Sequence, residues 1–220
     1  MNVTSKADSE LSLSSLKEEC KWDLISDLSE EELIIVDSLL KKIEHGLRKK
    51  GIKSRLKSRT KSFESALAKC KEKNLEPTFD NILGSLYDLA AGRIIVSTLD
   101  DIDIAKGLLM ARKLDKSAPF VIIEERDYIE NPKDNGYQSY HVIIQFEVTF
   151  DNVVYPMMSE IQIRTNLQDS WSENEHAVGY KNSNQSPELK EDLKTLSKMI
   201  KQCDEFLAKS LRDEDERKKH

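Results

Sequence analysis

Hydrophobic and polar positions change in short blocks along the second half of the chain. Apolar runs or alternation, both typical of β-strands, occur at 92–97, 120–125, 141–148 and 160–165. Residues 100–114 lie between the first two of these segments and have the spacing of a capped helix. Strands that alternate irregularly with helices predict an α+β fold, in which helices flank a mixed β-sheet.

Helical periodicity dominates the two ends of the chain. Ser29 precedes a segment with acids in its first turn and bases in its last, which predicts a helix over about 30–46 with Ser29 as its N-cap. Residues 187–211 place apolar side chains on one helical face, which predicts a long amphipathic helix followed by a frayed charged tail. Shorter helices are expected from Phe63 onward and over 166–178.

The order of these elements predicts one globular domain with additional helices at both ends. A chain of 220 residues is long enough to bury one sizeable core. We expect an acidic helical segment at 1–46, the main domain at 47–185, and the amphipathic helix with its charged tail at 186–220.

Charge is distributed unevenly along the chain. The net charge is −6, yet residues 1–40 carry ten acids against three Lys or Arg, and residues 41–73 carry thirteen Lys or Arg against three acids. The total argues against indiscriminate nucleic-acid binding, while the basic stretch is suited to phosphate groups. A solvated face is an equally ordinary explanation of such a stretch.

Several features exclude other classes of protein. No apolar run approaches the roughly 18 residues that a membrane-spanning helix needs, and the N-terminal residues lack the apolar core of a signal peptide. Cys20, Cys70 and Cys203 lie far apart with no CxxC spacing, so neither a zinc site nor a disulfide framework is indicated. We therefore expect a cytosolic protein with no membrane partner.

The segment EIQIRT at 160–165 carries polar side chains in strict alternation. Ile161 and Ile163 are expected on one face of a strand, and Glu160, Gln162 and Arg164 on the other. An ordinary half-buried strand with a solvated face has the same pattern. Its neighbours must decide whether the carboxylate, amide and guanidinium form a site.

Asp88 is the second acid of interest, because it directly precedes a predicted strand that begins near Arg93. Magnesium sites typically use one or two carboxylates together with substrate phosphates. Asp88 and Glu160 would satisfy that requirement. A helix-capping or salt-bridged aspartate is the alternative interpretation of Asp88.

Phosphate binding here would depend on side chains, because the chain has neither a GxGxxG nor a GxxxxGK[ST] motif. The segment KDNGYQSYH at 133–141 combines a turn glycine, an aromatic ring and cationic side chains, which is typical of a nucleotide-binding loop. Tyr137 as a core aromatic and His176 as a structural histidine are the competing interpretations. Further cations alternate along the basic stretch at Arg55, Lys57, Arg59 and Lys61.

Five segments in this order resemble the alarmone synthetase domain of the RelA/SpoT family: SRLK (54–57), YDLAAGR (87–93), RDYIENPKDNGYQSYH (126–141), EIQIRT (160–165) and WSENEHAVGYK (171–181). The resemblance covers roughly residues 50–182 and is closest to small, single-domain synthetases. The HDxxED motif of the family's hydrolase domain does not occur. The resemblance therefore implies synthesis without hydrolysis.

The resemblance implies a nucleotidyltransferase-like fold and a reaction that moves the β,γ-pyrophosphate of ATP to the ribose 3′-hydroxyl of GDP or GTP, releasing AMP. It implies Mg²⁺ held by Asp88 and Glu160, with Glu160 also the catalytic base. The ATP-binding residues that it implies are Arg55 and Arg93 around adenine, and Lys57, Arg59, Lys61 and Lys69 near the phosphates. The acceptor-binding residues that it implies are Tyr137 stacked on guanine, with Lys133, Asn135, His141, Gln162, Glu175 and His176 around it.

Two segments depart from the family pattern. Ala68 stands near a position where related small synthetases carry an arginine pair, and only Lys69 and Lys71 lie close by in the sequence. A lysine neutralises phosphate but lacks the bidentate fork of arginine, so Arg59 or Lys61 would have to substitute. The segment EERD at 124–127 does not decide between GDP and GTP.

A different acceptor is the main alternative. Some relatives are toxins of toxin–antitoxin pairs, which pyrophosphorylate the 3′-CCA end of tRNA or make adenosine alarmones with a similar site. An RNA backbone would be attracted by the basic stretch at 41–73. Relatives of this size often form homo-oligomers through helices outside the catalytic core, so a second copy of the chain is also an expected partner.

Overall fold

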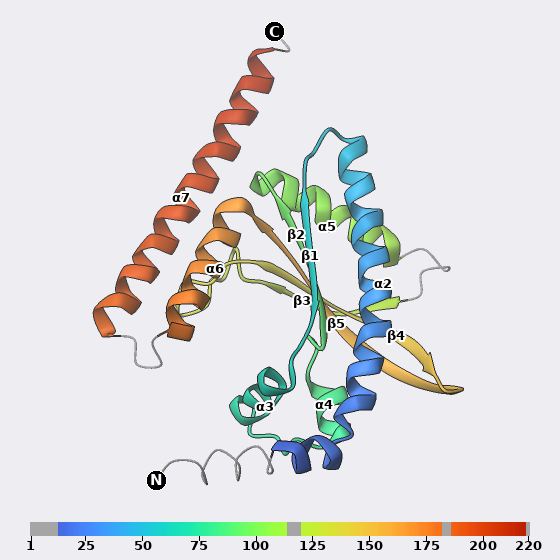
Figure 1. The fold of residues 1–220 in the computed structure, drawn as a ribbon. Helices are drawn as coiled ribbons and strands as arrows, with labels where there is room; N and C mark the ends of the chain where they lie inside the picture. Colours follow the sequence, from blue (N-terminus) through green and yellow to red (C-terminus); the bar gives the residue numbers. More distant parts are fainter. Residues whose placement is uncertain (1–12, 114–119, 182–185, 219–220) are drawn as a thin grey trace.

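The computed structural model describes residues 13–113, 120–181 and 186–218. Its centre is a five-stranded mixed sheet in the order β1-β2-β5-β4-β3 (Figure 1). β2 and β5 are parallel, and the other neighbours are antiparallel. The strands are β1 (Arg55–Thr60), β2 (Ala90–Val96), β3 (Phe120–Asp127), β4 (Tyr140–Phe150) and β5 (Val153–Thr165). The expected α+β class with a mixed sheet is confirmed.

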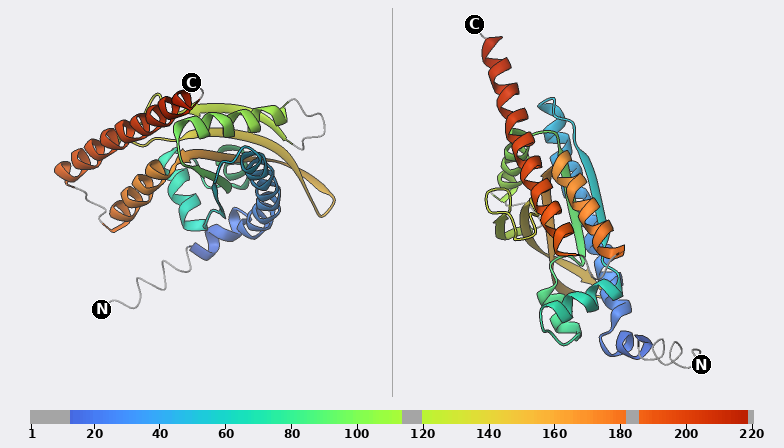
Figure 2. Two further views of the ribbon diagram at one scale, coloured as in Figure 1. Left: turned by 90° about the horizontal axis from the view of Figure 1, so that it is seen from above. Right: turned by 90° about the vertical axis from the view of Figure 1, so that its left-hand side faces the viewer.

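Helices cover the two faces of this sheet differently, and Figure 2 shows α2 on the opposite side from α6 and α7. The apolar face packs against α2 and α5, whereas α6 lies over the polar face. The helices are α2 (Trp22–Lys49), α3 (Phe63–Glu72), α4 (Phe79–Ser85), α5 (Leu99–Lys113), α6 (Asn166–Lys181) and α7 (Pro187–Arg217). Within the described residues, no helix is both long and apolar enough to span a bilayer.

Gly92 allows α2 to approach the sheet closely. A Cβ at this position would lie 2.9 Å from Val36 and 3.1 Å from Leu40, two fully or almost fully buried side chains of α2. Any larger residue would force the helix away from β2. α2 is therefore part of the main core, and it continues through the expected domain boundary between residues 46 and 47.

The predicted start of this first long helix is wrong. The helix begins at Trp22, and Ser29 lies inside it on the buried face. The Ser29 hydroxyl donates to the carbonyl oxygen of Ile25 at 2.7 Å, so a local bond within the helix satisfies a group that resembled an N-cap. Residues 1–12 of the expected acidic segment lie outside the described residues.

β5 is longer than the predicted strand at 160–165, because it starts at Val153. It is joined to β4 by a hairpin turn in which Asp151 and Asn152 both have positive φ, at 48° and 62°. Aspartate and asparagine tolerate this left-handed conformation better than most residues, which fits a two-residue hairpin loop. Arg93, expected at the start of its strand, lies in the middle of β2.

α7 exists as predicted, and mainly small and polar side chains of this helix face the protein. Ser186 caps it by accepting a hydrogen bond from the Leu189 amide, and the helix runs to Arg217 where a frayed tail was expected. Its buried side chains are Ser197, Asp204 and Ala208. Several large apolar side chains of α7 are exposed to solvent: Leu196, Met199, Phe206, Leu207 and Leu211.

Candidate active site

The predicted alternation along β5 is confirmed. Ile161 and Ile163 are fully buried in the apolar core. On the other face, Glu160 and Gln162 are in register with Ala91 and Arg93 of β2, so side chains from both strands share one polar surface. β4 adds His141 opposite Gln162.

Asp88 lies two residues before β2 and next to the part of β5 that carries Glu160. Asp88 forms an isolated β-bridge with Ser159, the residue before Glu160. The Asp88 carboxylate lies 2.8 Å from the Lys61 ammonium, whose side chain is almost buried. Lys61 therefore pairs with Asp88 in this structure, although it was expected near the phosphates of ATP.

The Glu160 carboxylate is held in its ionised form. Its oxygens lie 3.0 Å from His141 Nδ1 and accept a hydrogen bond from Gln162 Nε2 at 2.7 Å. Burial alone would raise the pKa of Glu160, but the contact with His141, the Gln162 bond and the charge of Lys133 outweigh it and lower the pKa to about 2. The site therefore presents a carboxylate, not a carboxylic acid, at neutral pH.

A ring of polar contacts joins Glu160 to Tyr137. The Tyr137 hydroxyl lies 2.8 Å from His141 Nε2, and it accepts a hydrogen bond from Arg164 at 2.7 Å. The Arg164 guanidinium also donates to Gln162 Oε1, which closes the ring through the Glu160 contact. These contacts fix the orientation of the Tyr137 side chain, whose ring also meets the edge of Tyr128.

We call residues 133–139 the tyrosine loop. Gly136 has φ +94°, a conformation that side chains rarely adopt, and this lets the loop turn. The Lys133 ammonium lies 4.9 Å from the centre of the Tyr137 ring, and burial lowers its pKa. Asn135 caps the turn by accepting from the Tyr137 amide, and its own amide group reaches Glu175 at 3.5 Å.

α7 anchors the tyrosine loop through buried polar groups. Gln138 Nε2 donates to the hydroxyl of Ser197 at 2.7 Å, and that hydroxyl donates to the carbonyl oxygen of Gly136. Further along α7, Asp204 accepts from Thr165 at the end of β5. The polar inner face of α7 therefore contacts both the tyrosine loop and the end of β5.

Arg55, Lys57 and Arg93 form what we call the cation cluster. Lys57 and Arg93 are register partners on β1 and β2. Two carboxylates of α6 hold the cluster: Asp169 lies 2.7 Å from Arg93, 3.2 Å from Lys57 and 3.9 Å from Arg55, and Glu173 lies 2.6 Å from Arg93. The structure therefore gathers three cations that were expected to bind ATP.

Three other predicted site residues lie apart from these groups. Arg59 is exposed on β1, and its side chain has no hydrogen bond or ion pair with the described part of the chain. Lys69 pairs with Glu72 on the surface of α3 at 2.9 Å. His176 is exposed on α6 and likewise has no polar partner among the described residues, so its side chain does not join the tyrosine loop.

Sequence reasoning missed the acids that hold the cation cluster. Asp169 is almost fully buried, and it follows the end of β5 at the start of a helix. Its spacing of four residues from Glu173 places both acids on one helical face, which was the available signal. Arg164 lies on the predicted face of β5, but its contacts with Tyr137 and Gln162 are not predicted by the sequence.

The donor set at Asp88 and Glu160 fits Mg²⁺, because carboxylate oxygens are the ligands that this ion prefers. Within the described ranges, no group of three or more Asp, Glu, His or Cys side chains is placed to hold a metal. Two carboxylates suffice when water and substrate phosphates complete the coordination. The residues present are therefore compatible with a metal held partly by the substrate.

Comparisons with known proteins place this geometry in a family. Residues 58–185 match the family described as the region found in RelA / SpoT proteins. Among curated proteins, GTP pyrophosphokinase YwaC of Bacillus subtilis is 37% identical over 150 residues, which cover 68% of this chain and 69% of that protein. GTP pyrophosphokinase YjbM of the same species is 33% identical over 151 residues, covering 68% of each chain.

Solved structures agree with this assignment. The small alarmone synthetase 1 of Bacillus subtilis bound to its product pppGpp superposes with a TM-score of 0.77 at 28% identity, covering 88% of this chain and 97% of the other. A GTP pyrophosphokinase family protein of Streptococcus pneumoniae gives a TM-score of 0.76 at 28% identity, with 89% and 95% covered. The chain therefore belongs to the RelA/SpoT family, and over most of its length it is similar to the small alarmone synthetases of that family.

Proposed function

We propose that this protein transfers the β,γ-pyrophosphate of ATP to the ribose 3′-hydroxyl of GDP or GTP and releases AMP. The observation that carries the proposal is the position of Glu160, an ionised carboxylate between the cation cluster and the tyrosine loop on one sheet face. The relatives YwaC and YjbM, both GTP pyrophosphokinases by name, support the same reaction.

ATP would bind at the cation cluster. Its phosphates offer Lys57 more negative charge than Asp169 and Glu173 do, so they can replace those partners. The planar guanidinium groups of Arg55 and Arg93 are suited to stack on the two faces of adenine. Positioning and charge neutralisation of this kind supply most of the catalysis in phosphoryl-type transfer.

The acceptor would bind beside the tyrosine loop, with guanine on Tyr137 and its phosphates near Lys133. In the reaction, the 3′-oxygen forms a bond to the β-phosphorus while the bond from that phosphorus to the bridging α,β-oxygen breaks. The bond's electron pair leaves with AMP, and the hydroxyl proton passes to Glu160. Because a carboxylate with so low a pKa is a weak base, close orientation of the hydroxyl must compensate.

Asp88 and Glu160 would hold Mg²⁺ in this scheme. The ion, when bound, neutralises charge on the phosphate oxygens. Lys61, which contacts Asp88, would then be freed to meet the same phosphates, as the family resemblance implies.

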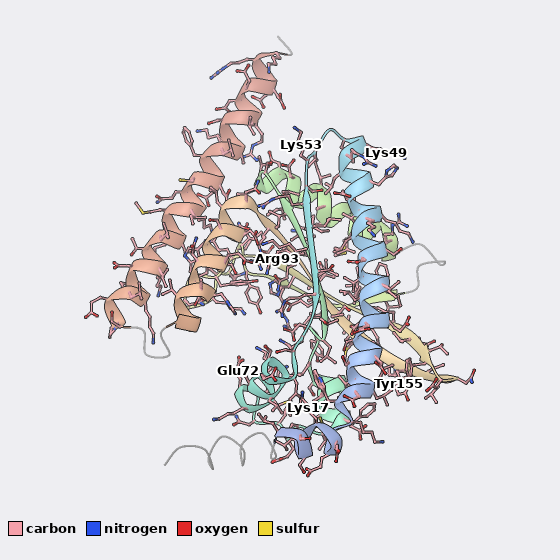
Figure 3. All side chains as sticks on the ribbon, viewed as in Figure 1. Lys17, Lys49, Lys53, Glu72, Arg93 and Tyr155 are labelled. Carbon is pink, nitrogen blue, oxygen red and sulfur yellow. The ribbon has the colours of Figure 1, made fainter. Side chains whose placement is uncertain are left out.

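An RNA acceptor gains no support from the shape of the molecule. The basic stretch at 41–73 does not form one surface at the site. Figure 3 shows two of its lysines, Lys49 and Lys53, at one end of the molecule, whereas Arg93 of the cation cluster lies near the centre. A tRNA or adenosine acceptor, an antitoxin partner and a cytosolic location stay predictions from the sequence.

A transfer assay tests the proposed function. The purified protein is incubated with ATP labelled at the γ-phosphate, Mg²⁺ and, in separate reactions, GDP, GTP, AMP or deacylated tRNA. We expect label in GDP or GTP. Label only in AMP or tRNA would mean that the acceptor is not GDP or GTP. Label in none of the acceptors, while YwaC is active under the same conditions, would refute the proposal that the protein is an enzyme.

The exposed face of α7 is the surface that a second copy of the chain would cover. Met199 is 57% exposed and Phe206 is 73% exposed, and such apolar patches typically mark interfaces. We expect Met199→Glu combined with Phe206→Glu to reduce the mass in light scattering without loss of folding. An unchanged mass for this variant would contradict assembly through α7.

A further inference from the structure

Glu32 is a carboxyl group buried in an otherwise apolar interface. It lies on the face of α2 that packs on the sheet, and its side chain is completely inaccessible to solvent. One oxygen accepts a hydrogen bond from the Ser159 hydroxyl at 2.5 Å, and the other has no hydrogen-bond partner in the described part of the chain. Burial of such a group is costly, and an aliphatic residue would fill the same space without that cost.

The surroundings of Glu32 keep it neutral. Burial raises its pKa to about 8, and this outweighs the Ser159 bond and the Ala90 amide, which act to lower it, while the charge of Asp88 raises it further. A buried charge would need a cation, but a protonated carboxyl needs only hydrogen bonds. The group can therefore persist in the core as a polar bridge.

The Ser159 hydroxyl and the nearby Ala90 amide both lie close in sequence to the proposed catalytic carboxylates. Ser159 directly precedes Glu160 on β5, and Ala90, the first residue of β2, follows Asp88 by two positions. The β-bridge between Asp88 and Ser159 also links these two segments directly. Glu32 thus contacts the backbone region from which both Asp88 and Glu160 project.

We propose that Glu32 is a positioning residue that fixes the relative placement of Asp88 and Glu160 from beneath the sheet. The inference depends on the proposed function for these two carboxylates. It concerns a residue that touches neither substrate nor metal and lies outside the segment at 58–185 that matches the family.

The test compares three variants. Glu32→Gln keeps a polar group of the same shape, Glu32→Leu removes the hydrogen bond with Ser159 without leaving a cavity, and Val36→Ala removes apolar volume one turn further along the same helix face. We expect Glu32→Leu to lower kcat by about 10- to 100-fold, since a misplacement of ~1 Å can cost about that much. It should also raise the Mg²⁺ concentration needed for half activity, while the KM for ATP stays within about twofold because the cation cluster is untouched.

The controls separate positioning from general stability. Glu32→Gln should retain kcat within about threefold, and Val36→Ala should lower the melting temperature without changing the Mg²⁺ requirement. If Glu32→Leu does not fold, Ser159→Ala removes the same bond from the other side and should lower kcat in the same direction. Wild-type kcat and Mg²⁺ dependence in the folded Glu32→Leu or Ser159→Ala variant, or an equal loss of kcat in Val36→Ala, would overturn the proposal.

A second readout distinguishes this inference from the proposed function. Hydrogen exchange measured by mass spectrometry on peptides that contain 87–91 and 157–161 should be faster in Glu32→Leu than in Val36→Ala of matched stability. If the wild-type protein transfers pyrophosphate to no acceptor but this exchange difference is present, the proposed function fails and the structural bridge stands. Equal exchange in the two variants would refute the bridge itself.

Discussion

The cation cluster and the tyrosine loop lie on the same sheet face but are held by different forces. Arg55, Lys57 and Arg93 are held by opposite charges on α6, and part of the cluster is open to solvent. The tyrosine loop is held by hydrogen bonds of Gln138 and Ser197 that are buried against α7. Ion pairs therefore organise the cation cluster, and buried hydrogen bonds organise the tyrosine loop.

This difference predicts how each side responds to a ligand. Lys57 and Glu173 are half-exposed, and ion pairs of this kind contribute little free energy and exchange partners easily, so a polyphosphate can displace Glu173. Buried neutral hydrogen bonds resist rearrangement, because a group left without its partner costs about 1–3 kcal/mol. We therefore expect the cation cluster to rearrange on binding and the tyrosine loop to stay largely preformed.

Glu160 lies where the two regions meet, and its loss should have the largest effect. Glu160→Gln keeps the size of the side chain but removes the proton acceptor, so we expect kcat to fall by about 1,000-fold or more. ATP binding, measured by calorimetry, should change little because the cation cluster is intact. Full activity of this variant would refute the role of Glu160 as the base.

The same carboxylate should make stability depend on acid. Its pKa in the folded protein is about 2, below the value of 4.5 expected in the unfolded chain. The stabilisation is therefore complete above about pH 5 and is lost as the pH falls toward 2, and it amounts to roughly 3 kcal/mol. Denaturant unfolding of wild type and Glu160→Gln at pH 6 and pH 3 checks this, and a stability difference that stays constant with pH would contradict it.

Arg93→Ala tests whether charge organises the ATP side. We expect the KM for ATP to rise by about 10- to 100-fold, since one of the two guanidinium faces that stack on adenine is lost, and stacking on a base contributes about 1–3 kcal/mol, while the acceptor KM stays nearly constant. Arg59→Ala is the matched control, because Arg59 is an exposed arginine on the adjacent strand outside the cluster. Equal effects of the two substitutions would mean that the cluster has no special part in ATP binding.

Tyr137→Ala tests the acceptor side in the same way. Loss of a stacking surface should raise the acceptor KM by about tenfold, because stacking on an aromatic ring contributes about 1–3 kcal/mol per base. The KM for ATP should be nearly constant, which is the reverse of the Arg93→Ala result. An unaltered acceptor KM would argue against stacking on Tyr137.

Ser197→Ala should have the smallest effect. It tests whether buried hydrogen bonds to α7 organise the tyrosine loop. It removes the bonds of the Ser197 hydroxyl to Gln138 and Gly136 without touching any substrate. We expect the acceptor KM to rise about two- to fivefold, which corresponds to about 0.4–1 kcal/mol and is typical of the net contribution of a neutral hydrogen bond. Exposed Ser210 on the same helix provides a control through Ser210→Ala, which should be neutral.

The sequence predicted an element correctly where the local pattern of apolar residues matches the side that is buried in the folded protein. The alternation at 160–165 predicted the polar face of β5 because one side of that strand is fully buried. Ser29 misled because local spacing cannot show that a helix starts earlier and buries the residue. The stripe at 189–211 indicated a helix correctly, but not that its polar side would face the protein.

Most of what sequence reasoning missed depends on contacts between distant residues. Asp169 meets Arg93 across 76 positions, and Glu32 meets Ser159 across 127. No periodicity within a short window carries such information. The first half of β5 was missed for a more local reason, because the Asp151–Asn152 turn was not identified as a hairpin.

The parallel pairing of β2 and β5 has a consequence for synthesis of the chain. Arg93 and Gln162 are neighbours in the sheet but 69 positions apart in sequence, and β3 and β4 are made between them. Pairings of such long range form late, because the intervening loop must first be closed. A nascent chain that ends before β5 has both the cation cluster residues and Tyr137 but lacks Glu160, so enzymatic activity can begin only when the last strand has left the ribosome.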